Sequence, residues 1–134
     1  MIYVLDTNTC IFHLKGTFDG LSKKLTGTHT SNILIPSVVA AELMLGAGKS
    51  AKRDQNMVVI KAFLSLFKIV SFDEQAAEHY ARIRAELELN GNMIGGNDLL
   101  IAATAISNGG IVVTNNTDEF SRIRGLCVED WTLI

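Results

Sequence analysis

The chain has 134 residues, of which 48% are hydrophobic, and its formal net charge is −2. A chain of this length buries about two-thirds of its unfolded surface around one core, so we expect a single domain over residues 1–134, and the slight excess of acids argues against nucleic-acid binding by bulk positive charge. No apolar run approaches the length of a membrane span and no signal peptide is recognisable, so we expect a cytoplasmic protein with no membrane partner.

The first half of the chain alternates apolar strands with helices. Residues 2–5 form an apolar run that predicts a strand, and Asp6-Thr7-Asn8 directly after it is typical of a helix start. A second strand is expected over 32–35 and a helix over 36–45, ended by Gly46 and Gly48. Recurring apolar residues then predict an amphipathic helix over 51–67.

The second half continues this alternation. We expect a strand over 69–72, a helix capped by Asp73 that closes near 90–91, a helix over 98–107, a strand over 111–113 and a short strand near 127–128. Unbroken apolar strands that alternate with helices indicate a parallel sheet buried on both faces. The fold class is therefore α/β, a three-layer α/β/α arrangement around a central, mostly parallel sheet of about four to five strands.

Three acidic residues interrupt this apolar pattern. Asp6 ends the first strand, Glu42 shares a helical face with Val39, and Asp98 shares one with Ala102. Burying an ionised carboxylate without a partner costs several kcal/mol, so three of them predict a shared cation site. Carboxylate oxygens without a Cys or His cluster favour Mg²⁺ or Mn²⁺ over zinc.

The expected topology also predicts where this site lies. Ligands of open parallel α/β sheets bind at the carboxyl ends of the strands, where the strand order reverses. Two strands end there in polar residues, Asp6-Thr7-Asn8 and Thr114-Asn115-Asn116. A metal at this edge can activate water and neutralise charge on a phosphate. The pattern therefore favours phosphodiester hydrolysis without a catalytic Ser or Cys.

Other interpretations remain open for the same residues. Asp6 can be a plain helix N-cap, and Asp98 a cap or a first-turn acid stabilised by the helix dipole. A strand that ends in Asp also describes an aspartyl phosphotransferase, although haloacid dehalogenase-like enzymes carry a second Asp where this chain has Asn8. A non-catalytic dimeric binding module would use the acids only as caps.

A phosphate-loop motif is a weaker alternative. Residues 46–50, Gly-Ala-Gly-Lys-Ser, end like a phosphate loop. The full pattern needs glycine at position 43, which is Leu43, and a strand before the loop, whereas a helix is expected here. We therefore expect Lys49 to flank the path of a phosphodiester substrate and not a bound nucleotide.

Four segments carry a family resemblance: Leu5-Asp6-Thr7-Asn8, Ala41-Glu42-Leu43, 94–102 and 113–120. In these segments the chain resembles PIN-domain ribonucleases and, within them, the VapC-type toxins of bacterial toxin–antitoxin systems. The resemblance covers nearly the whole chain. It implies an Mg²⁺- or Mn²⁺-dependent endoribonuclease, often aimed at transfer RNA and silenced by a cognate antitoxin whose C-terminal segment covers the site.

The resemblance also implies roles for individual residues. Asp6, Glu42 and Asp98 match the catalytic acids that bind the metal. Many members carry a fourth acid where this chain has Asn116, and Glu119 is the nearest acid that could compensate. The remaining candidates, expected to orient the carboxylates, are Thr7, Asn8 and Thr114.

Two expectations concern the surface and the thiols. The high hydrophobic fraction leaves apolar surface to cover, so we expect a homodimer. Cys10 and Cys127 lie far apart without a CxxC spacing, which supports neither a disulfide nor a zinc site. We expect both to be reduced, buried thiols.

Overall fold

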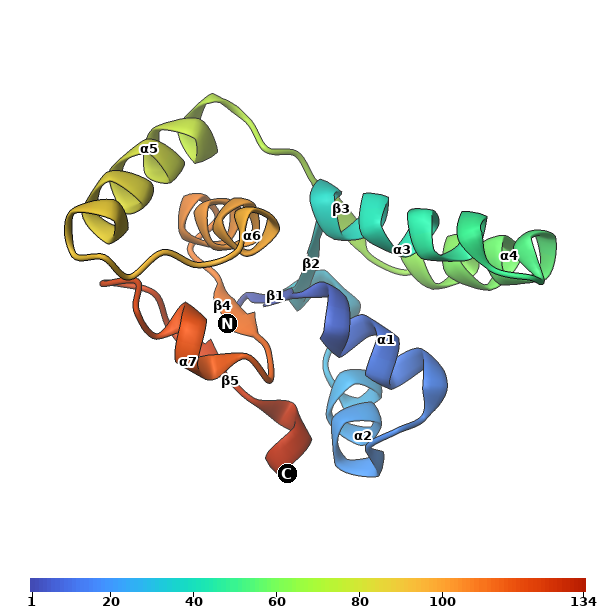
Figure 1. The fold of residues 1–134 in the computed structure, drawn as a ribbon. Helices are drawn as coiled ribbons and strands as arrows, with labels where there is room; N and C mark the ends of the chain where they lie inside the picture. The colour runs from blue at the N-terminus through green and yellow to red at the C-terminus, as the bar shows by residue number, and fades with distance from the viewer.

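A computed structural model describes residues 1–134 and shows a central sheet with helices on both faces (Figure 1). All five strands are parallel, in the spatial order β3-β2-β1-β4-β5. The strands are β1 (Tyr3–Leu5), β2 (Ile33–Pro36), β3 (Lys68–Val70), β4 (Ile111–Val113) and β5 (Val128–Glu129). The predicted α/β class and parallel sheet are confirmed.

The helices fall into groups around this sheet. In Figure 1, α5 and α6 lie together on one side of the sheet, α1 and α2 lie on the other, and α3 and α4 project as an antiparallel pair. The helices are α1 (Thr7–Lys15), α2 (Asp19–Gly27), α3 (Ser37–Lys49), α4 (Arg53–Leu64), α5 (Glu74–Leu89), α6 (Gly96–Ser107) and α7 (Thr117–Phe120), with 3₁₀ turns η1 (Thr30–Asn32) and η2 (Trp131–Leu133). None of these helices has the length and apolarity that crossing a bilayer demands.

The strand order creates a switch point at the middle of the sheet. β1 pairs on one side with β2 and on the other with β4, in the registers Val4↔Leu34 and Val4↔Val112. The chain therefore leaves β1 and β4 at adjacent positions of one edge but turns to different sides of the sheet. Two diverging loops open a crevice at such a point, which is the edge where the sequence places Asp6 and Thr114.

The helix α3 continues beyond its predicted end. Gly46 and Gly48 lie inside the helix, which reaches Lys49. Ser50 ends it, because its backbone N–H and its hydroxyl both bond to the carbonyl of Ala47, at 3.2 and 2.7 Å. Interior glycines each cost a helix roughly 1 kcal/mol, and packing of buried Leu43 and Ala47 offsets that cost. The prediction of a break at Gly46 was wrong.

The structure adds one helix that was not expected and corrects one expectation. The helix α2 was not predicted, and Leu21 and Leu25 on its inner face are buried. Cys10 is a buried free thiol as expected, but Cys127 is exposed. Position 127 directly precedes β5 at the sheet edge, where no further strand covers it.

Candidate active site

Asp6 is the most buried acid of the molecule and starts α1. Its carboxylate accepts the backbone N–H of Thr9 at 2.9 Å, and only 4% of the residue is exposed. The hydroxyl of Thr9 in turn donates to the Val113 carbonyl at 3.0 Å, so this turn is fixed to the end of β4. Burial raises the pKa of Asp6, hydrogen bonds from Thr114 and Thr9 oppose the rise, and the charge of Glu42 adds to it.

Glu42 reaches the same edge from the helix α3. Its Oε1 accepts a hydrogen bond from the Thr7 hydroxyl at 2.7 Å, a contact that joins α3 to the first residue of α1. The residue is half-buried, with buried Val39 on one side and Leu45, which is 61% exposed, on the other. Glu42 therefore lies at the rim of the apolar helix face. The sequence pattern had placed it within that face.

Asp98 lies in the first turn of α6 and makes no cap hydrogen bond there. Its Oδ2 lies 3.4 Å from the side-chain nitrogen of Asn116. Burial is the main reason that its pKa rises to about 7, followed by a hydrogen bond and charge repulsion from Glu119 and then by the charges of Asp6 and Glu42. The negative charges of the other three acids thus all raise the pKa of Asp98.

Glu119 lies in the short helix α7 and joins the cluster through Asn116 in the loop before it. The Asn116 side-chain nitrogen donates to Glu119 Oε2 at 2.8 Å and so bridges Glu119 and Asp98. The Asn116 backbone N–H also bonds to the hydroxyl of buried Thr114, at 2.9 Å. The structure therefore brings both Asn116 and Glu119 to the three acids singled out from the sequence.

Asn8 does not share these contacts. Its side chain is exposed and makes no hydrogen bond within the protein, whereas the Thr7 hydroxyl bonds to Glu42 and Thr114 helps to lower the pKa of Asp6. The helix geometry explains the difference, because Asn8 is turned by about 100° from Thr7 around α1. Asn8 instead lines the open groove beside the site.

No basic residue neutralises the four acids. The ion pairs of the molecule join Arg53 to Asp54, Arg84 to Glu88 and Arg124 to Glu86, all outside this cluster. Partly buried carboxylates that repel one another and have no basic partner are a donor set suited to Mg²⁺ or Mn²⁺. No three of their side chains stand together as a ligand set for a metal ion in this structure.

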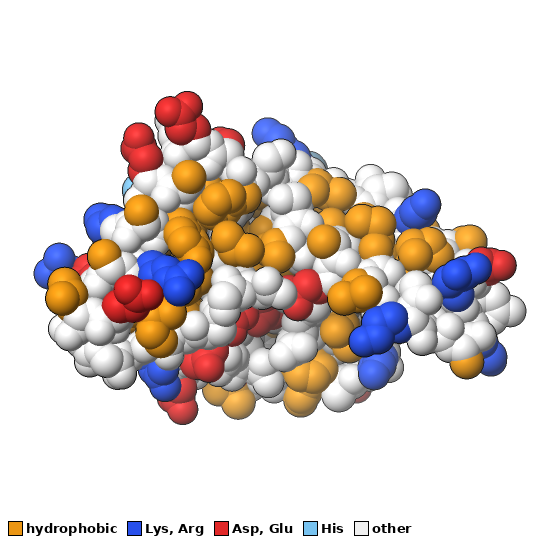
Figure 2. All heavy atoms as spheres, turned by 45° about the horizontal axis from the view of Figure 1, so that its top comes forward, with side chains coloured by type: hydrophobic (Ala, Val, Ile, Leu, Met, Phe, Trp, Pro, Cys, Tyr) orange, Lys and Arg blue, Asp and Glu red, His pale blue; other side chains and the backbone are white.

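A groove leads away from the acids between α1 and α3. It has a volume of about 460 Å³ and is lined by residues that include Thr7, Asn8, Glu42, Gly46 and Lys49. In Figure 2 acidic side chains lie in the middle of this face, and Lys and Arg side chains lie to the right, toward the end where α3 and α4 join. The site is therefore open to an extended ligand.

The phosphate-loop alternative does not fit the observed backbone. Residues 46–49 belong to α3, and the chain enters that helix from β2 at Ser37. A phosphate loop wraps its ligand in non-helical backbone between a strand and a helix. The resemblance of this segment to a nucleotide-binding motif is therefore coincidental.

Comparisons with known proteins agree with this geometry. The PIN domain model matches residues 3–126. The tRNA(fMet)-specific endonuclease VapC of Salmonella typhimurium is 42% identical over 129 residues, covering 96% of this chain and 97% of that protein. The VapC relatives match the chain from end to end, so the similarity includes every segment that contributes an acid.

Solved structures show the same fold. VapBC2 from Rickettsia felis, bound to a DNA fragment from their promoter, superposes with a TM-score of 0.91 at 42% identity, covering 98% of this chain and 99% of that one. VapBC-5 of Mycobacterium tuberculosis, from the VapBC family of toxin-antitoxin systems, gives a TM-score of 0.71 at 28% identity, covering 96% of each chain. The chain therefore belongs to the PIN-domain family and, within it, to the VapC ribonucleases.

Proposed function

We propose that this protein is an Mg²⁺- or Mn²⁺-dependent endoribonuclease toxin whose metal-binding acids are Asp6, Glu42 and Asp98. One observation carries the proposal: these acids converge with Glu119 at the switch point of the sheet, and no basic side chain pairs with them. Such a cluster repels a phosphodiester until a cation is present. Asn116 offers a neutral oxygen where the family resemblance implies a fourth acid, so we infer one tightly held metal.

Neighbouring threonines hold the carboxylates that would bind the metal. When bound, the metal supplies positive charge that offsets the charge of the phosphate and makes water a better nucleophile. Asp6 is held by the Thr9 backbone N–H and Glu42 by the Thr7 hydroxyl, so hydrogen bonds fix the carboxylates on both sides of the crevice. Fixed carboxylates need less rearrangement to bind a cation, which is how neighbouring donors tune a metal site.

We infer that transfer RNA is the substrate. The Salmonella typhimurium relative is named for action on tRNA(fMet), and its sequence matches this chain over almost its whole length. The groove beside the acids is open enough for an extended strand or a loop. Metal-assisted hydrolysis does not itself require the 2′-hydroxyl, so the preference for RNA over DNA rests on this kinship.

We infer that a cognate antitoxin inhibits the enzyme, because the VapBC-5 relative belongs to the VapBC family of toxin-antitoxin systems. An arginine side chain has the planar donors to bind two carboxylate oxygens at once. In this cluster it would compete with the metal for Asp98 and Glu42. Inhibition is then relieved when excess metal or loss of the antitoxin frees the acids.

A homodimer is part of the same proposal. Several large apolar side chains are exposed, among them Val58, Leu66 and Leu89 at 70%, 60% and 87%. Exposed apolar area of this kind favours self-association. Sedimentation at micromolar concentration tests this point, with a mass twice that of one chain as the expected result.

The central test is cleavage of total RNA with Mn²⁺ or Mg²⁺, followed by mapping of the cut ends. Wild-type protein is expected to give discrete cuts that EDTA abolishes, while Asp98→Ala, with unchanged circular dichroism, gives none. Cleavage that persists in both EDTA and Asp98→Ala would contradict the proposal, because the acids would then have no part in the reaction.

A further inference from the structure

A second hollow adjoins the groove at the far end of α3. It has a volume of about 580 Å³ and lies at the turn between α3 and α4, where its lining includes Gly48, Ser50, Lys52 and Arg53. Ser50 lines both this hollow and the groove that reaches Glu42. The two depressions therefore adjoin at Ser50 and together mark a path from the acids to the turn.

The charge along this path changes sign. Lys49, Lys52 and Arg53 are exposed, and Asp54 is the only acid among residues 49–54. Arg53 and Asp54 lie 3.9 Å apart, with side chains 70% and 100% exposed, a geometry that contributes little binding energy. The guanidinium of Arg53 and both ammonium groups thus remain available to an anionic ligand.

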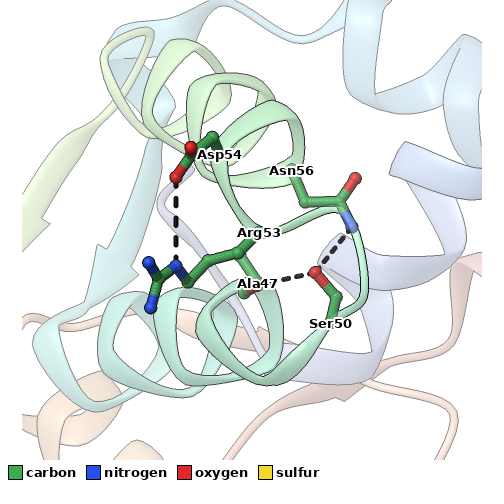
Figure 3. A network of polar contacts seen from close by, with 5 residues as sticks. All are labelled: Ala47, Ser50, Arg53, Asp54 and Asn56. Atoms are coloured by element: carbon green, nitrogen blue, oxygen red, sulfur yellow. Dashed lines mark hydrogen bonds and ion pairs between the residues drawn. The ribbon is translucent and has the colours of Figure 1, made fainter.

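Hydrogen bonds hold the turn in shape (Figure 3). The Ser50 hydroxyl donates to the Ala47 carbonyl at 2.7 Å and accepts from the Asn56 side chain at 2.9 Å, so one hydroxyl joins the end of α3 to the first turns of α4. The basic side chains therefore extend from a fixed backbone. A fixed platform loses less conformational entropy when it binds a ligand.

The spacing along α3 suits a polynucleotide. Lys49 follows Glu42 by seven residues, so both lie on one face of the helix, about 10 Å apart along its axis. Gly46 lies between them and nothing approaches the position of a side chain there. A strand whose cleaved phosphate lies at the acids can thus continue over Gly46 toward the lysine.

We propose that Lys49, Lys52 and Arg53 bind backbone phosphates of the RNA on one side of the cleaved bond. These are positioning residues, because they lie away from the acids and act by holding the strand. The inference rests on the proposed function and adds a substrate-binding surface to it. Positive charge favours RNA over an antitoxin arginine at this surface, because like charges repel.

The test compares two matched double variants. K49Q/K52Q removes two charges from the path, and K23Q/K68Q removes two exposed lysines from α2 and β3. With an RNA that the wild type cuts, we expect K49Q/K52Q to raise KM about 5- to 20-fold with kcat unchanged, and to lower the dependence of log affinity on log salt by about 1.4. K23Q/K68Q should change neither quantity.

A short RNA separates positioning from damage to the fold. An oligonucleotide that ends one nucleotide beyond the cleaved bond on each side cannot reach the turn, so all variants should cut it equally. Equal KM values for the two double variants on the long RNA would overturn the proposal. Weaker binding of the antitoxin by K49Q/K52Q, with unchanged KM for RNA, would instead assign the surface to the antitoxin.

A binding measurement keeps this inference separate from the proposed function. Affinity for a transfer RNA is measured by fluorescence anisotropy in an Asp98→Asn background, which the proposed mechanism makes inactive. If the wild type cuts no RNA, the proposed function fails, and the anisotropy still decides the inference. Equal affinity of K49Q/K52Q and K23Q/K68Q for RNA in that background would reject it.

Discussion

Two aspartates begin helices in this molecule with the same local geometry. Asp6 at α1 and Asp73 at α5 are both extended, and each carboxylate accepts the backbone N–H three residues on at 2.9 Å. Their surroundings differ, because Asp6 is almost fully buried beside Glu42 whereas Asp73 is exposed. A capping role therefore accounts for the hydrogen bond at both positions but not for the burial of Asp6.

The difference shows how a structural role and a chemical role can coincide in one residue. Capping and metal binding were alternatives for Asp6 when only the sequence was considered. The structure shows that the cap uses the Oδ1 atom while the residue also lies within the field of other acids. The neighbours of a carboxylate, more than its local bonds, distinguish a candidate site from a plain cap.

The largest expected effect is on catalysis at Asp6. Asp6→Asn keeps a cap-forming oxygen but removes the charge, so RNA cleavage should fall at least ~10³-fold, equivalent to about 4 kcal/mol in the transition state. Asp73→Asn makes the same chemical change in the exposed cap and should leave cleavage unaltered. The two rates, measured on one RNA with saturating Mn²⁺, are compared directly. Equal losses in both would end the distinction between the two sites.

The hydrogen bond from Thr7 to Glu42 should matter next. Thr7→Val removes the hydroxyl that fixes Glu42 Oε1 while keeping a similar volume. Loss of such an orienting donor typically costs about 10- to 100-fold in metal affinity or activity. Isothermal titration with Mn²⁺ measures the metal affinity, and RNA cleavage measures the activity. Thr26→Val, which removes an exposed hydroxyl from α2, is the control.

The stability of the metal-free protein should fall as pH rises through the range in which the clustered acids lose their protons. Asp98 has a folded-state pKa of about 7 against an ordinary 3.8, and the pKa of Asp6 is also raised. Between these values the folded state binds more protons than the unfolded one, so the stability that Asp98 contributes is fully present below about pH 4 and is lost up to about pH 7. Allowing for solvent screening, we expect a loss on the order of 1–2 kcal/mol.

Urea unfolding in EDTA across that pH range measures this decline. Asp98→Asn should flatten it because it removes the titrating group, and Mn²⁺ should reverse it by neutralising the cluster. Asp73→Asn should retain the wild-type slope. A decline of the same size in Asp98→Asn would show that the slope arises elsewhere in the molecule.

The smallest effect is expected from Asp73→Ala. Loss of the exposed cap should lower the free energy of unfolding by about 1 kcal/mol, with metal affinity and RNA cleavage unchanged. Urea denaturation and the cleavage assay check the two halves of this prediction. A marked loss of activity in this variant would show that α5 influences the site through α6, against which it packs.

Much of the sheet and of the acid cluster could be predicted from sequence, for a physical reason. Strands buried on both faces appear as unbroken apolar runs, and Ile33 and Ile35 are indeed fully buried. The polar residues that end β1 and β4 are then conspicuous. The helix α2 lacks such a signal, because Gly20 and Gly27 weaken its intrinsic propensity and its packing against η2 stabilises it.

The contacts within the site were harder to predict than its members. Whether Asn8 or Thr7 turns toward Glu42 depends on where α1 begins, which sequence patterns locate only to within a few residues. The bridge from Asn116 to Glu119 and Asp98 depends on the short helix α7, which was not predicted. Tertiary geometry, and not residue type, decides these contacts.

The position of β1 between β2 and β4 also governs when the acids can meet. Tyr3 pairs with Ile111, so strands from opposite ends of the chain must associate before Asp6 lies beside Asp98 and Glu119. Contacts so distant in sequence form late in folding, and a chain on the ribosome cannot make them until its last third has emerged. Under the proposed function, a growing chain therefore cannot cut RNA, and its synthesis is separated in time from its attack on the translation machinery.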